Sequence, residues 1–170
     1  MPDDTSRNQA MFQLAARLAR EVELRHVGTI RVGAGLDQPP AALAVRAAGA
    51  GGRLALSAQQ KHAFDQKQGQ LTVEIAFRAG VAPADPAAAE VFHVEATFAL
   101  VYDVRVPPAE AERPKVFEAF AAMNGTYNAW PYLREVLSSM AARLGAPPVL
   151  LPVFRPEMLG TTEGPKAART

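Results

Sequence analysis

The chain of 170 residues contains no cysteine. Without thiols it can form no disulfide, no thiolate metal site and no cysteine nucleophile. It also lacks an apolar run of roughly 20 residues, the length that spans a bilayer as a helix. Its N-terminal stretch MPDDTSRNQ is polar and acidic, without the apolar core of a signal peptide. We therefore expect a cytoplasmic protein with no membrane insertion.

An excess of charge of either sign is also missing. The chain carries 18 Lys and Arg against 17 Asp and Glu, for a formal net charge of +1. The basic residues are dispersed, whereas a nucleic-acid interface needs a basic field on one surface. We therefore expect no nucleic-acid partner. The hydrophobic content of 49% is that of an ordinary globular domain.

The motifs of common catalytic and cofactor sites are absent as well. The sequence has no GxxxxGK[ST] phosphate loop, no HExxH and no GxSxG element. His26, His62 and His93 fall on three separate predicted strands, without the spacing of metal ligands. Glu74 and Glu95 lie on polar strand faces, where paired carboxylates for acid–base catalysis cannot be inferred. We expect no catalytic residue, no metal and no cofactor.

What is present is a clear apolar periodicity. Helical spacing follows a capping-box pair, Ser6 and Gln9, while period-two alternation appears four times further along the chain. The first strand slips in register near Gly28. These patterns predict a helix over 6–19 and strands over 21–33, 53–64, 70–78 and 92–104. Loops rich in Gly, Ala and Pro are predicted over 33–52 and 80–89, with a polar hairpin turn at 65–69. Within the first loop, residues 41–48 are compatible with a helical turn or a short extended piece.

Two helices are predicted after the last strand. The first runs from Pro114 to Met123, and the pair Asn124 and Gly125 closes it, because both residues tolerate the left-handed backbone. The second opens at Pro131, where a missing N–H is no loss. Its apolar stripe consists of Leu133, Val136, Leu137, Met140, Ala141 and Leu144.

The second helix has a strong stop signal. Gly145 lies just past the last apolar position of the stripe, and Pro147 and Pro148 forbid continuation. Because the strands precede these two helices, the class is α+β: a four-stranded antiparallel sheet with a short and a long C-terminal helix packed on one face, plus an N-terminal helix. We divide the chain into an N-terminal helical extension (1–20), a main domain (21–156) and a small polar tail (157–170) that we expect to be disordered.

Three aromatic residues, Tyr127, Trp130 and Tyr132, cluster at the start of the long helix. In one interpretation their bulk fixes the helix to the sheet as core packing. In the other they line a groove for apolar ligands, because aromatic surfaces suit adaptable recognition. The pattern alone leaves both open.

The same region carries a resemblance to a known family. The sequence AWPYLRE at 129–135, the amphipathic helix after it and the exit PPVLLP at 147–152 resemble the SecB-type export chaperones. The segment FHVE at 92–95 is similar to the family's fourth strand, and the order of strands and helices is similar too. The resemblance covers residues 21–156.

This resemblance implies a homotetramer, built as a dimer of dimers, that holds unfolded polypeptide clients without ATP, for protein export. The client groove would lie between the long helix, the sheet and the segment before the helix. Its implied lining consists of Phe98, Leu100, Tyr102, Tyr127, Trp130 and Tyr132.

The charges depart from the family pattern. SecB proteins of the export pathway are usually strongly acidic and dock the SecA motor through carboxylates on the outer face of the sheet. Glu95 matches one such carboxylate, whereas Arg31 and Gly35 stand where the first strand's acidic residues would lie. Two alternatives therefore stay open: a SecB-like module for one dedicated partner, such as a toxin–antitoxin pair, or a site for a small apolar ligand. An enzyme of hotdog-like build is disfavoured, because no acid, base or nucleophile constellation is visible and such a fold places its main helix early.

Overall fold

The computed structural model describes residues 4–37, 53–82, 90–146, 149 and 151–154. The predictions for residues 41–48, for Pro147 and Pro148 and for the tail at 157–170 lie outside these residues. None of the described helices is both long enough and apolar enough to cross a membrane.

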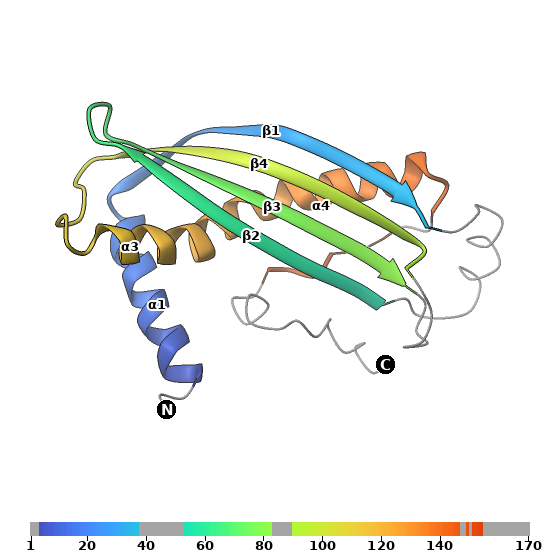
Figure 1. Cartoon of the computed structure of the whole chain (residues 1–170), viewed down its shortest axis with the longest axis horizontal. Helices are drawn as coiled ribbons and strands as arrows, with labels where there is room; N and C mark the ends of the chain where they lie inside the picture. Colours follow the sequence, from blue (N-terminus) through green and yellow to red (C-terminus); the bar gives the residue numbers. More distant parts are fainter. Residues whose placement is uncertain (1–3, 38–52, 83–89, 147–148, 150, 155–170) are drawn as a thin grey trace. The chain divides into compact units, whose positions relative to one another are not determined.

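The order of elements confirms the predicted α+β class (Figure 1). A helix precedes four strands, and a run of helical turns follows them. The elements are α1 (Asp4–Ala19), β1 (Val22–Leu36), β2 (Arg53–Asp65), β3 (Gln70–Ala82), β4 (Phe92–Val104), α3 (Arg113–Phe120), the π-helical turn η1 (Ala121–Gly125) and α4 (Thr126–Arg143).

The four strands form one sheet in the order β1-β4-β3-β2, so β1 and β2 are its edges (Figure 1). The two central strands bury alternate side chains, as a sheet covered on one face does. Most side chains of β1 are exposed instead. The hairpin between β2 and β3 turns at Gly69, whose φ of +66° favours glycine, and Asp65 accepts hydrogen bonds from the N–H groups of Lys67 and Gln68.

The chain divides into two compact units. The first unit comprises residues 1–29, 59–75 and 98–129, and the second comprises 30–58, 76–97 and 130–170. Each strand contributes one part to the first unit and the other part to the second.

In the first unit, helices cover the sheet through aromatic contacts. The Phe117 ring of α3 lies 5.0 Å from the Phe64 ring of β2, and the Phe120 ring lies 5.0 Å from Tyr102 of β4. Helix α1 packs against α3 (Figure 1) and buries Ala15. Within this unit, the N-terminal helix covers α3.

The predicted helix stop at Asn124 and Gly125 is wrong. Gly125 has no positive φ, and the chain continues from α3 through the wide turn η1 into α4. Glycine is required here for a different reason. A Cβ at this buried position would lie 2.9 Å from Cγ1 of Val73 and 3.2 Å from Cδ1 of Ile75, so the helical backbone approaches β3 too closely for a side chain.

The predicted helix start at Pro131 is also wrong, because Pro131 lies inside α4. Proline removes one backbone donor from a helix interior. The helix nevertheless continues, and its apolar stripe buries Leu133, Leu137 and Ala141 completely. The free energy gained by burying this stripe outweighs the unfavourable helix propensity of Pro131.

The predicted end of this helix is confirmed. Gly145 has a φ of +68°, and its N–H donates to the carbonyl of Ala142. The N–H of Ala146 reaches back to the carbonyl of Ala141 at 2.8 Å. This pair of bonds is a Schellman motif, which satisfies the last helical carbonyls.

Two strands are longer than predicted. Strand β1 continues to Leu36 and strand β3 to Ala82, although each passes glycines that the sequence assigns to loops. Gly80 is the clearer case. A Cβ there would collide with the carboxylate of Glu90, so this glycine makes room for a side chain of the second unit.

Gly125→Ala tests the close approach of helix and strand. Alanine gains up to about 1 kcal/mol of helix propensity, but overpacking against Val73 costs about 1–3 kcal/mol. We expect net destabilisation in chemical denaturation, partly reversed by adding Val73→Ala. Gly33→Ala, where nothing lies within 4 Å of the added Cβ, is the control. A Gly125→Ala protein as stable as the parent would refute the packing role.

Candidate functional site

The aromatic cluster of the second unit is built around Trp130. Its side chain is only 4% exposed, and its ring lies 6.2 Å from Phe77 of β3 and 5.2 Å from Phe154. The first contact is edge-to-face, an arrangement that aromatic pairs favour. Trp130 therefore packs in the core of this unit, as the first of the two interpretations expects.

The segment at 151–154, which we call the strap, covers Trp130. The indole Nε1–H donates to the carbonyl of Pro152 at 2.9 Å. The guanidinium of Arg134 donates to the carbonyls of Leu151 and Pro152 at 3.3 and 3.4 Å. The strap residues form no helix or strand. The sequence presents this segment only as the exit of the helix, and its contact with Trp130 was not predicted.

Tyr132, two positions after Trp130, stays 41% exposed on α4. The residue types gave no basis for separating it from its buried neighbour Trp130. Within the second unit, the structure thus offers one buried aromatic residue under the strap and one exposed aromatic residue on the same helix.

The other predicted groove residues belong to the first unit. Phe98, Leu100 and Tyr102 are buried on the core side of β4, while Tyr127 is 61% exposed. Burial raises the pKa of Tyr102 to about 12, although the hydrogen bond from Asn128 to its hydroxyl acts in the opposite direction. The Tyr102 hydroxyl is therefore neutral at physiological pH.

The polar positions of the strands carry ion pairs. In the first unit, Arg25 pairs with Asp103, and Lys61 pairs with Glu74 at 2.7 Å. The Arg25 side chain lowers the pKa of the Asp103 carboxyl by hydrogen bonding. These carboxylates therefore have cations beside them.

The second unit has a denser charged cluster. Arg78 donates to both carboxylate oxygens of Glu90, which lowers the pKa of Glu90, and Nδ1 of His93 lies 3.0 Å from the carboxylate of Asp37. Asp37, Glu90 and His93 each place one potential metal ligand within 4.8 Å of the others. The protein itself partners both carboxylates, so a cation would have to displace these contacts.

The residues discussed for SecA docking lie in this second unit. Glu95 is half-buried on β4, and its charge contributes to the raised pKa of Arg78. Arg31 is exposed on β1. The imidazole of His93 occupies the space beside Gly35, where a Cβ would lie 2.8 Å from the ring. A larger residue than glycine would therefore displace His93.

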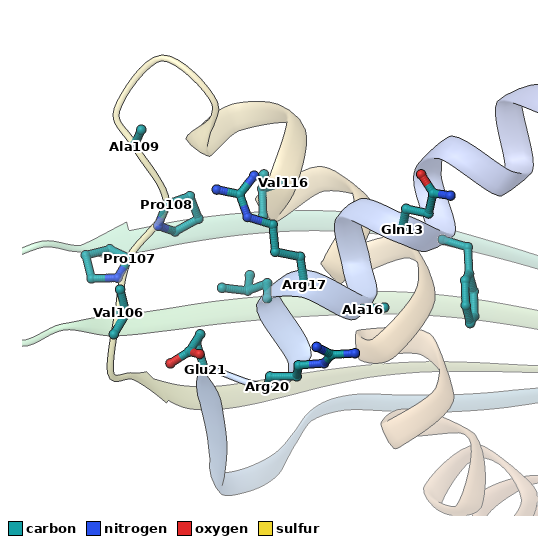
Figure 2. Close-up of a pocket in the computed structure, with 12 residues that line it drawn as sticks. Gln13, Ala16, Arg17, Arg20, Glu21, Val106, Pro107, Pro108, Ala109 and Val116 are labelled. Atoms are coloured by element: carbon teal, nitrogen blue, oxygen red, sulfur yellow. The ribbon is translucent and has the colours of Figure 1, made fainter.

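The first unit contains a furrow of about 560 Å³ between α1 and the segment after β4. Figure 2 shows Ala16 and Arg17 of α1 on one side and Val106 and Pro107 on the other. The lining side chains of Phe12 and Val106 remain 56% and 61% exposed. Small-molecule sites bury most of their ligand, so this open furrow does not favour the small-ligand alternative.

The Glu90–Arg78 pair predicts a specific acid response. Because the folded-state pKa of Glu90 is lowered, its contribution to stability is present at neutral pH and disappears as the pH falls through that pKa. Both side chains are partly exposed, which limits the effect to about 1 kcal/mol or less. Glu90→Gln should melt below the parent at pH 7, and the gap should narrow towards pH 3. Glu118→Gln, at an exposed carboxylate of α3, is the control. The same difference in melting temperature between Glu90→Gln and the parent at both pH values would contradict the ion-pair explanation.

Comparison with known proteins gives a clear result at the level of structure alone. No family model and no curated protein sequence matches the chain. Among solved structures, it is similar to the SecB-like chaperone Rv1957 of Mycobacterium tuberculosis, in complex with a ChAD peptide from the Rv1956 HigA1 antitoxin. The TM-score is 0.66 at 23% identity, over 84% of this chain and 97% of that one. A protein of unknown function from Streptococcus agalactiae gives a TM-score of 0.41 at 9% identity, over 78% of this chain and 97% of that one. The chain therefore has a SecB-like fold.

Proposed function

We propose that the chain is an ATP-independent, SecB-like holdase that binds unfolded polypeptides in the cytoplasm. The observation that carries the proposal is the exposed Tyr132, which follows the Trp130 cluster on α4 of a SecB-like fold. Unfolded chains expose apolar side chains, whose burial contributes about 25 cal/mol per Å². An aromatic surface therefore distinguishes unfolded from folded clients without nucleotide hydrolysis.

The six groove residues have two different roles in this proposal. Tyr127 and Tyr132 are exposed and make the first contacts with a client. The buried residues Phe98, Leu100, Tyr102 and Trp130 hold the surrounding elements in place. The Mycobacterium chaperone of similar fold binds a peptide from an antitoxin, which supports polypeptide segments as the ligand class.

A second candidate function is a binding module for one dedicated partner, such as an antitoxin, without SecA docking. The charge pattern favours it over export. Glu74 and Asp103 each have a cation beside them in the first unit, and Glu90 has Arg78 in the second. Surface carboxylates that are paired within the protein are less available to a partner that docks through carboxylates.

We also propose that the chain assembles as a homotetramer, a dimer of dimers. Strand β1 supports self-association because it is a sheet edge whose side chains Ile30 and Val32 are 56% and 36% exposed. An exposed apolar edge strand pairs readily with another chain. Oligomer formation would cover these side chains and the unpaired edge.

The decisive test of the holdase proposal is a titration with a slow-folding client, chemically unfolded in one series and native in the other. The parent protein should bind only the unfolded form. Tyr132→Ala should weaken this binding about tenfold, equivalent to roughly 1.4 kcal/mol, because an exposed aromatic contact is lost. Glu135→Ala, an exposed change on the same helix, is the matched control and should bind like the parent.

Equal binding of both client forms, or of neither, would refute a general holdase. A panel of unrelated unfolded clients separates the two candidate functions. Similar affinity across the panel supports the holdase, whereas tight binding of a single sequence supports the dedicated module.

Ile30→Lys tests the assembly. A lysine on an edge strand blocks pairing with another chain, so the variant should form a smaller species than the parent tetramer in native mass spectrometry. Ser57→Lys, at an exposed position of the opposite edge strand β2, should leave the mass unchanged. If Ile30→Lys remains a tetramer, β1 is not the contact between copies.

A further inference from the structure

The strap at 151–154 is bound to the second unit in the manner of a peptide ligand. Its inward side chains, Leu151 and Phe154, are 5% and 9% exposed, while Val153 between them is 72% exposed. Phe154 lies against Trp130, with 5.2 Å between the ring centroids. Leu151 and Phe154, at positions i and i+3, are therefore the two apolar anchors of the strap.

The polar contacts of the strap involve only its backbone. Trp130 donates to the carbonyl of Pro152, and Arg134 donates to the carbonyls of Leu151 and Pro152, at 2.9 to 3.4 Å. Backbone carbonyls are the same in every sequence. The side chains of Trp130 and Arg134 could therefore donate to any extended segment that offers free carbonyl groups between two apolar side chains. Main-chain hydrogen bonds contribute affinity in the same way in other modes of peptide recognition.

We infer that the strap occupies a client site of its own chain and that a client displaces it. The ligand class is an extended, non-native polypeptide segment with large apolar side chains at positions i and i+3 and unpaired carbonyls between them. This inference rests on the proposed holdase function and adds the chemistry and the regulation of its site. Displacement uncovers Trp130, the ring against which the anchor Phe154 packs.

The energetics permit such an exchange. The strap forms no helix or strand, so opening it breaks three hydrogen bonds and exposes two apolar anchors but disrupts no sheet or helix. A bound client would replace these contacts with equivalent ones of its own. Because it is tethered to α4, the strap competes at an effective concentration in the millimolar range. The apparent affinity for clients is proportional to the fraction of molecules in which the strap is open. A change that loosens the strap therefore raises this affinity.

The test uses a labelled, capped peptide with the sequence of residues 149–155, and a control peptide with Ser in place of Leu151 and Phe154. Fluorescence anisotropy measures binding, and Trp130, the chain's single tryptophan, reports it independently by its emission. Phe154→Ala, which removes one anchor, should bind the first peptide at least about tenfold more tightly than the parent. Val153→Ala, at the exposed position of the strap, should bind like the parent, and the Ser peptide should bind to neither.

Circular dichroism establishes that each variant is folded. If Phe154→Ala does not fold, Phe154→Leu, which keeps an apolar anchor, should still give tighter binding than the parent. Equal or weaker binding by a folded anchor variant overturns the inference, because the strap is then a fixed part of the core.

A parallel titration with unfolded client separates this inference from the proposed function. Unfolded client bound by the parent, with unchanged affinity in Phe154→Ala, overturns the strap inference and leaves the holdase standing. Tighter peptide binding by Phe154→Ala, without binding of unfolded client by any variant, supports the strap site and removes the holdase function.

Discussion

The close approach of the helical backbone to strand β3 at Gly125 is the constraint on which the first unit depends. A Cβ there would lie 2.9 Å from Val73, so only glycine lets the wide turn η1 pass the strand. The chain can then run from α3 into α4 without a loop.

Long apolar repeats made most of the fold predictable. The bounds of β4 agree with the prediction, because its alternation extends over 13 residues and leaves no other register. The end of α4 at Gly145 was predictable for a similar reason, since the stripe and the left-handed glycine point to the same residue. Where several independent signals agree, the sequence determines the local structure.

Single glycines and prolines were less informative, because each has more than one structural use. Gly125 serves close packing rather than a turn, Gly80 makes room for Glu90, and Pro131 is tolerated inside a helix. For the two glycines the reason is the side chain of a residue on another segment, which local patterns cannot supply. The ion pairs between strands are unpredictable for the same reason, because they depend on the register of the sheet.

The sequence predicted which residues make up the candidate site, but not which of them are buried. The sequence identified Trp130 and Tyr132 as members of one aromatic cluster, but it could not show that one is buried and the other 41% exposed. The strap contributes Phe154 and the carbonyl of Pro152 to the surroundings of Trp130, and Phe77 of β3 contributes its ring. A segment that the sequence presents as an exit from a helix thus takes part in burying Trp130.

In the proposed holdase, the strap would resolve a conflict between binding and solubility. A site for unfolded chains must be apolar, yet a large exposed apolar patch promotes self-association. The net charge of +1 gives little electrostatic repulsion between copies, so charge alone does not keep them apart. Hydrogen bonds to its carbonyls and two apolar anchors hold the strap over Trp130. Under the inference that a client displaces the strap, the client would replace these same backbone contacts. One exchange would then account for a covered site in the free state and for broad selectivity in the bound state.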